Sequence, residues 1–153
     1  MLVNYKKANV LAVERGVGKS KLILESGINV IEDDIWESAQ ANLAGHIKAG
    51  TVVPIYKVEK QKVKEKVKEK VTGKDGKVTE KEVEKEVEKE VNVPCTPDDI
   101  PADKIDGVIA DIVTDGQADK FVQAATKESV RAKGMNRKNK IAEELKDREP
   151  TKK

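Results

Sequence analysis

The middle of the chain carries two charged repeats whose periodicity constrains the fold more strongly than any other feature. The first repeat reads KVKEKVKEKV over residues 62–71, and the second reads EKEVEKEVEKEV over residues 80–91. Lysine and glutamate favour helices, but a helix would place like charges such as Lys64 and Lys68 four residues apart, which destabilises it. Valine at every fourth position also drifts around a helix instead of forming one apolar seam. A helix is therefore disfavoured for this segment.

The same segment is ordered by a period of two, which is the periodicity of a β-strand. Alternate positions place only lysines on one face of the first repeat and only glutamates on one face of the second, with valines on the opposite faces. The residues Lys74-Asp75-Gly76 suit a three-residue hairpin loop that ends in a left-handed glycine. In this register the numbers of paired residues add to 150, so that Val67 faces Val83 and lysine faces glutamate.

The register of this predicted hairpin depends on its turn. A two-residue loop at Asp75-Gly76 would set like charges opposite one another, whereas cross-strand pairs of opposite charge stabilise a hairpin. A shift by four residues keeps the charges matched, so that only the turn distinguishes those two registers. On the valine side we predict that Glu69 faces Lys81 and that Glu65 faces Lys85. A helix and a solvated, disordered segment are the alternatives to the hairpin.

The predicted hairpin, residues 58–93, needs a partner. An isolated two-stranded hairpin is marginally stable in water, and its open edges suit the addition of further strands. We therefore expect it to be an arm that contacts neighbouring subunits. The expected interface consists of five cross-strand pairs: Lys64–Glu86, Lys66–Glu84, Lys68–Glu82, Val63–Val87 and Val67–Val83.

The segment before the hairpin, residues 1–57, predicts a small α+β module. Short β-favouring runs occur within residues 2–13 and 21–31, and glycines interrupt them. Acidic residues followed by an apolar stripe at helical spacing predict a helix over residues 33–49. Residues 51–56 then read as a closing strand.

Few residues of the chain are candidates for catalysis or metal binding. Cys95 is the single cysteine and His46 the single histidine, which excludes a disulfide within the chain and a cysteine- or histidine-rich metal site. Residues 16–20 read GVGKS, like the end of a phosphate-binding loop, but Val13 stands where that loop needs its first glycine, and a strand-like run follows. No apolar run approaches the ~18–20 residues of a membrane span. We expect no enzyme activity, no cofactor and no membrane partner.

The segment after the hairpin, residues 94–148, predicts a module of three helices, followed by a loose tail at 149–153. The expected helices span residues 96–113, with a break near Pro101, 117–132, ended by Gly134, and 139–147. The chain as a whole is thus expected to be an α+β protein. It would have a small N-terminal α+β module, a long charged two-stranded β-hairpin arm and a small C-terminal helical module.

The charges of the C-terminal segment are split. Residues 94–126 hold 2 basic and 7 acidic side chains, whereas residues 127–153 hold 10 basic and 5 acidic ones. The whole chain is nearly neutral, at +2, so that no general field attracts nucleic acid. Phosphate contacts by basic C-terminal helices, as in a nucleic-acid-binding accessory protein, are the alternative function; a solvated surface is favoured because no aromatic side chains lie between the cations. The cations concerned are Arg131, Lys133, Arg137, Lys138 and Lys140.

A motif in the N-terminal module carries a family resemblance. Its matching residues are Gly27, Asn29, Val30, Trp36 and Gly50. The pattern resembles a small module encoded among the head genes of tailed, Mu-like bacteriophages, in which a Pro-Gly-x-Asn-x-Val turn precedes a tryptophan-containing helix and a late glycine. Here serine replaces the proline.

This resemblance implies a non-catalytic virion structural protein and supplies no catalytic residues. Such a protein would be a head decoration, cement or minor head protein, present in the host cytoplasm during assembly. Its partners would be the major capsid protein or other virion subunits, and it would form a homo-oligomer or a high-copy assembly.

Overall fold

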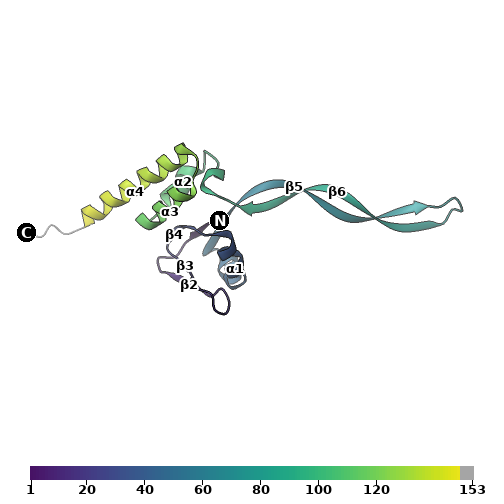
Figure 1. The fold of residues 1–153 in the computed structure, drawn as a ribbon, viewed down its shortest axis with the longest axis horizontal. Coiled ribbons are helices and arrows are strands. Elements are labelled where there is room, and N and C mark those ends of the chain that lie inside the picture. Colours follow the sequence, from purple (N-terminus) through teal and green to yellow (C-terminus); the bar gives the residue numbers. More distant parts are fainter. Residues whose placement is uncertain (149–153) are drawn as a thin grey trace, which may run out of the picture. The chain divides into compact units, whose positions relative to one another are not determined.

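The computed structural model describes residues 1–148 and divides them into two compact units, most of whose elements are labelled in Figure 1. The first unit joins residues 1–57 to residues 94–148, and the second unit is the segment Val58–Val93. Helices and sheets are both present, which confirms the α+β class. The tail expected at residues 149–153 lies outside the described residues.

The first unit is built around a short antiparallel sheet. Its central strand β1 (Leu2–Tyr5) pairs on one side with β4 (Gly27–Val30) and on the other with the first residues of β5 (Val52–Thr72). A separate two-stranded sheet consists of β2 (Leu11–Val13) and β3 (Leu22–Leu24). The strands expected in the N-terminal segment are therefore present, although they fall into two sheets.

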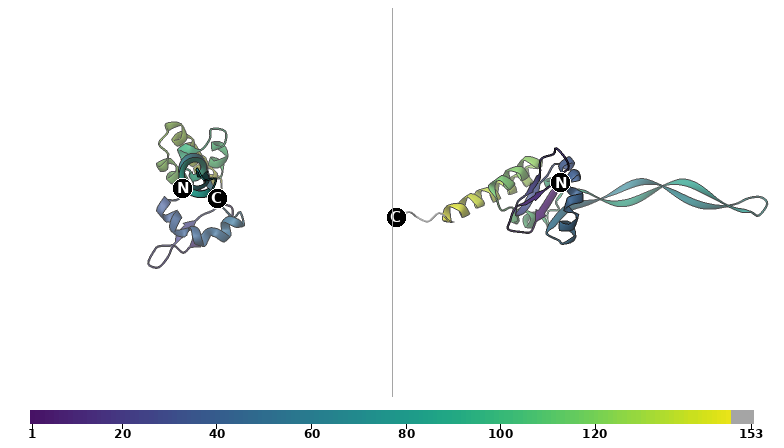
Figure 2. Two further views of the ribbon diagram at one scale, coloured as in Figure 1. Left: turned by 90° about the vertical axis from the view of Figure 1, so that its right-hand side faces the viewer. Right: turned by 90° about the horizontal axis from the view of Figure 1, so that it is seen from below.

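Strand β1 is buried on both of its faces, which makes the first unit a layered structure. Val3 and Tyr5 point to a core that includes Trp36 and Leu43 of helix α1 (Asp33–Lys48). This helix confirms the one predicted over residues 33–49. Leu2, on the other face, belongs to a second core formed mainly by the C-terminal helices. Figure 2 shows α1 and the C-terminal helices on opposite sides of the sheet.

The separation expected between the N-terminal and C-terminal modules is wrong. Leu2 and Ile28 share a core with Phe121 and Ile112, and all four side chains are fully buried. The backbone N–H of Ile28 also donates to the carbonyl of Asp111 at 3.1 Å. The core on this face of β1 is therefore built from both segments, whereas the core on its other face consists of residues from the N-terminal segment alone.

The bounds expected for the C-terminal helices also need correction. The observed elements are the 3-10 turn η1 (Pro97–Asp99) and the helices α2 (Ile105–Ala110), α3 (Asp115–Ala124) and α4 (Glu128–Arg148). A break falls between α3 and α4 because the carboxylate of Asp98 accepts the backbone N–H groups of Thr126 and Lys127 at 2.7 and 2.9 Å. This contact satisfies donors at the beginning of α4, as a capping side chain does.

Gly134 does not end a helix, contrary to expectation, but lies buried inside α4. A Cβ atom at this position would lie 2.7 Å from Cγ2 of Val122 and 3.1 Å from Cδ1 of Phe121. The glycine therefore allows α4 to approach α3 closely, and this packing outweighs the helix-breaking tendency of glycine.

The second unit consists of the long part of β5 and of β6 (Val78–Pro94), which pair with each other. The two strands wind around one another along their length (Figure 1). No residue from 58 to 93 is buried, so this unit has no core of its own.

Candidate functional site

The turn of the hairpin fixes its register. The backbone N–H of Gly73 donates to the carbonyl of Lys77 at 2.9 Å, and that of Gly76 donates to the carbonyl of Gly73 at 3.0 Å. Gly76 has a φ of 76°, in the left-handed region that the predicted loop requires. The three-residue loop at 74–76 is thereby confirmed, and the paired numbers at the turn add to 150 as predicted.

The same register holds at the far end of the paired strands. There the backbone N–H of Cys95 donates to the carbonyl of Ile55 at 3.3 Å, and these numbers again add to 150. The pairing therefore runs from the turn to the first unit without a net shift. Alternation along each strand then assigns every side chain of the hairpin to one of two faces.

The two faces differ in burial. The face that we call the charged face contains Lys62, Lys64, Lys66, Lys68 and Lys70 of β5 and Glu80, Glu82, Glu84, Glu86, Glu88 and Glu90 of β6, and all are exposed. The face that we call the valine face contains Val63, Glu65, Val67 and Glu69 of β5 and Lys81, Val83, Lys85, Val87 and Lys89 of β6. These four valines are half-buried.

The ion pairs of the valine face differ from the predicted ones. Glu69 pairs with Lys85, and Glu65 pairs with Lys89, instead of with the residues directly opposite them. The twist of a two-stranded ribbon brings diagonally related side chains together, so each pair reaches across a pair of facing valines. A register shifted by four residues would place these partners directly opposite, but the backbone bonds at both ends exclude that shift.

The ion pairs predicted on the charged face are not formed within the described chain. Lys64, Lys66 and Lys68 lie opposite glutamates in the register, yet none of these lysines has a carboxylate oxygen within ion-pair distance among residues 1–148. Exposed lysine–glutamate pairs gain little energy in water and cost side-chain entropy. Both charge columns of this face are therefore left to solvent or to a partner.

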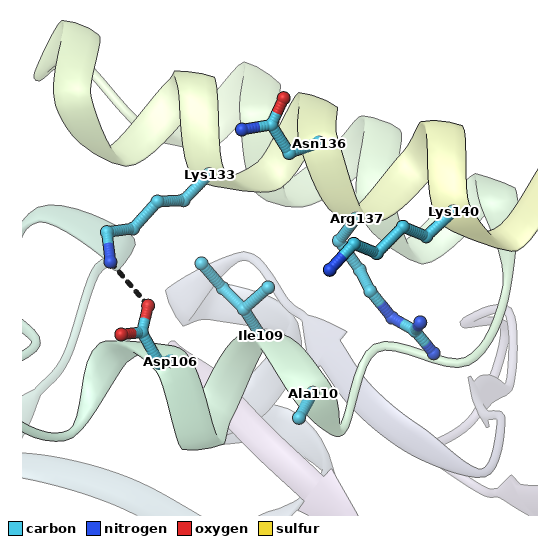
Figure 3. A pocket seen from close by; sticks show the side chains of 7 residues that line it. All are labelled: Asp106, Ile109, Ala110, Lys133, Asn136, Arg137 and Lys140. Atoms are coloured by element: carbon cyan, nitrogen blue, oxygen red, sulfur yellow. Dashed lines mark hydrogen bonds and ion pairs between the residues drawn. The ribbon is translucent and has the colours of Figure 1, made fainter.

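The five cations of the C-terminal segment do not form one surface. Three of them, Lys133, Arg137 and Lys140, line a groove of about 350 Å³ between α2 and α4, together with Ile109 and Asn136 (Figure 3). The structure therefore brings together three of the five cations that the phosphate-contact hypothesis names.

Carboxylates and a carbonyl of the same chain already engage two of the groove cations. Lys133 pairs with Asp106 across the groove (Figure 3). Arg137 donates from Nε to the carbonyl of Ile112 at 2.9 Å and from Nη1 to Glu144 at 3.0 Å. The contacts with Asp106 and Ile112 join α4 to α2 and to the segment that follows α2, whereas the contact with Glu144 lies within α4.

The remaining two cations lie elsewhere. Lys138 donates to Asp119 of α3 at 2.6 Å, and this hydrogen bond raises the pKa of the Lys138 ammonium group. Arg131 is exposed on α4 and does not line the groove. A single phosphate-binding surface made of all five cations is therefore not present.

The segment that follows the hairpin begins with a hydrogen-bonded cap. Asp99 accepts from the backbone N–H and the hydroxyl of Thr96 at 3.0 and 2.7 Å, and from Lys57 at 3.0 Å. Burial by itself would raise the pKa of Asp99, but these hydrogen bonds and the Lys57 charge outweigh it and lower the pKa to about 2. The neighbouring Cys95 is buried, and burial, followed by the charge of Asp99, raises the pKa of its thiol.

The residues that carry the family resemblance have structural roles in this chain. Gly27 has a φ of 94°, and the amide of Asn29 closes the adjoining turn through hydrogen bonds to the backbone of Glu25 and Gly27 at 2.7–3.0 Å. Trp36, on α1, is buried in the core that α1 shares with β1, as the spacing predicts. None of these three residues presents a free functional group to solvent.

Within residues 1–148, no group of three or more histidine, cysteine, aspartate or glutamate side chains is placed to hold a metal ion. No helix in the described part of the chain combines the length and apolar character that a membrane crossing requires. Comparison with protein-family models, with curated proteins and with solved structures gave no match.

Proposed function

We propose that this chain is a non-catalytic assembly protein whose hairpin, residues 58–93, contacts neighbouring subunits. The observation that carries the proposal is the separate hairpin unit, which has no buried residue and displays two complete columns of opposite charge. Ordering such a segment costs conformational entropy, and a lone two-stranded hairpin recovers little of that cost in water. A partner that covers the hairpin supplies the missing burial.

The family resemblance supports a bacteriophage particle as the setting. In this proposal the first unit and the hairpin bind the capsid shell, and the protein acts as a head decoration, cement or minor head protein. The partners are the major capsid protein or other virion subunits. The protein is then present in several copies on each particle.

The structure favours a structural use of the C-terminal cations over nucleic-acid binding. Lys133, Arg137 and Lys138 each bond to a carboxylate or carbonyl of the same chain. Cations that are already neutralised release few counterions from a phosphate backbone and add little affinity for it.

Co-sedimentation with phage particles of the strain that encodes the chain tests the assembly proposal. The test variant carries Glu82→Lys, Glu84→Lys and Glu86→Lys, which reverses the charge of three of the six glutamates on the charged face. We expect the unmodified protein to sediment with particles and the variant to stay in the supernatant. The matched control carries the same change of charge on the first unit, at the exposed residues Glu37, Glu143 and Asp147, and should sediment like the unmodified protein.

Two outcomes of this experiment would contradict the proposal. Sedimentation of the hairpin variant with particles would show that the charged face is not an assembly surface. An unmodified protein that remains in the supernatant would remove the virion setting.

A further inference from the structure

The valine face of the hairpin is an apolar stripe that the second unit itself leaves open. Val63 faces Val87, and Val67 faces Val83, so that two apolar pairs lie between charged levels. The diagonal ion pairs of Glu65 and Glu69 pass across these valines and leave them half-buried. Half-buried valines gain stability when a second apolar surface removes the remaining water.

We propose that the valine face binds the same face of a second copy of this chain, with a two-fold axis that runs along the hairpin. The two hairpins then lie parallel, face to face, with both turns at the same end. This inference rests on the proposed function, since it identifies a second copy as one partner of the arm.

Charge complementarity selects this partner. Rotation about an axis along the hairpin places β5 of one copy over β6 of the other. Glu65 then lies over Lys85 of the second copy, and Val67 lies over Val83 of the second copy. Both glutamate levels of the face meet their complements at once, because Glu65 is directly opposite Lys85 and Glu69 is directly opposite Lys81 in the register of 150.

The opposite orientation is disfavoured by the same residues. A two-fold axis across the strands would place β5 over β5 and β6 over β6. When the valines are then brought into contact, glutamate meets glutamate and lysine meets lysine at the neighbouring levels. Facing like charges destabilise an interface, so the parallel arrangement is the one that the sequence permits.

The charged face is a poorer surface for a second copy, although its columns are also complementary. It offers only lysine and glutamate, all exposed. Burying these charges costs more solvation than the pairs recover. A contact through the valine face buries fewer charges and adds apolar contacts between valines. The charged face then stays available to other subunits.

Two complementary charge-reversal variants test the interface in solution. One carries Glu65→Lys and Glu69→Lys, and the other carries Lys81→Glu and Lys85→Glu. By sedimentation velocity, we expect the unmodified protein to dimerise and each variant alone to show a dissociation constant at least tenfold higher. A mixture of the two variants should restore dimers, because every contact between unlike copies is again complementary.

The matched control for these variants carries Glu84→Lys and Glu86→Lys on the charged face, and it should dimerise like the unmodified protein. The recovery in the mixture also excludes simple unfolding of the hairpin, which mixing would not repair. An unmodified protein that stays monomeric, or a mixture that does not recover, would overturn the proposal. Equal loss of dimers in the charged-face control would overturn it as well.

The orientation is tested by a spin label at Asp75→Cys in the turn. Parallel hairpins place the two labels beside each other, whereas antiparallel hairpins separate them by about 50 Å or more at ~3.3 Å per residue. Cys95 is only 2% exposed, so the unmodified chain serves as the unlabelled control. Double electron–electron resonance should give a short distance between the two labels of the dimer, and a long distance would overturn the parallel arrangement.

The outcomes separate this inference from the proposed function. A dimer that does not sediment with particles retains the self-association and removes the virion role. A monomer that sediments with particles, and loses this binding when the valine face is charge-reversed, would assign the face to a shell subunit and overturn the inference.

Discussion

The two units of this protein owe their structure to different interactions. In the first unit, β1 is buried on both faces, and side chains such as Leu2 and Phe121 have no exposed surface. In the hairpin, from residue 58 to residue 93, no side chain is buried, and the strands are specified by turn geometry and by the alternation of charge. The comparison shows that close packing decides the first unit, whereas local pattern decides the second.

The largest effect is expected from the shared core of the first unit. Phe121→Ala removes a fully buried ring that packs where α4 crosses α3 at Gly134. We expect the free energy of unfolding to fall by about 3–5 kcal/mol, as measured by urea denaturation. Leu145→Ala, at a side chain that is 55% exposed, should cost less than ~1 kcal/mol. Similar losses for the two variants would contradict the claim that packing decides this unit.

The second-largest effect on the free energy of unfolding is expected from a substitution at Gly27. Its φ is 94°, and a Cβ atom would lie 2.3 Å from the backbone oxygen of Asp111. Gly50, with a φ of 70°, has no atom within 4 Å of the same position. Gly27→Ala should therefore lower the free energy of unfolding by about 3 kcal/mol, from strain and crowding together.

Gly50→Ala is the matched control for Gly27, because it changes the backbone strain alone. It should cost only about 1–2 kcal/mol in the same denaturation experiment. Equal costs at the two positions would show that the close approach of Asp111 is not a constraint on the first unit.

The same contrast explains how much of the fold the sequence could predict. The hairpin loop and its register follow from residues close to one another in the chain, and α1 follows from its acidic start and apolar stripe. The break between α3 and α4 could not be predicted, because its cause is Asp98, which lies 28 residues before Thr126. The role of Gly134 as a close-packing position inside α4 could not be predicted either. Glycine by its propensity indicates a helix end, and only the contact with Phe121 explains why it lies inside the helix.

In the hairpin, the sequence could predict the register of the strands but not the ion pairs between them. The positions that share each face follow from the period of two, and the structure keeps them together. The diagonal pairing of Glu69 with Lys85 depends on the twist of the ribbon, which the sequence pattern does not specify. In the C-terminal segment, the sequence could not show that Asp106 and Asp119 would engage two of the five cations.

An ionic contact in the first unit should make its stability depend on pH. The pKa of Asp99 is about 2 in the folded protein against an ordinary value of 3.8. Its carboxylate therefore stabilises the fold above pH ~4, and this contribution is lost as the pH falls from about 4 to 2. Asp99→Asn should cost up to about 2 kcal/mol at pH 7 and nothing near pH 2, as measured by urea denaturation.

The control for Asp99 lies in the hairpin, where Glu65 makes an ion pair in solvent. Glu65→Gln should change the free energy of unfolding by less than ~1 kcal/mol at pH 7 and at pH 2. A pH dependence that survives Asp99→Asn would assign the acid sensitivity to other carboxyl groups.

The smallest effect is expected from the diagonal ion pairs of the hairpin. Its measurement decides whether Glu69 interacts with Lys85, as in the structure, or with Lys81, which lies directly opposite it. A double-mutant cycle between Glu69 and Lys85, each changed to Ala, should give a coupling of about 0.2–0.5 kcal/mol. The cycle between Glu69 and Lys81, which lie directly opposite, should give almost none. Amide hydrogen exchange of the hairpin in the monomer measures both, because local opening reports the hairpin apart from the first unit. If the direct pair shows the larger coupling, then charge alternation alone decides the contacts, and twist adds nothing to them.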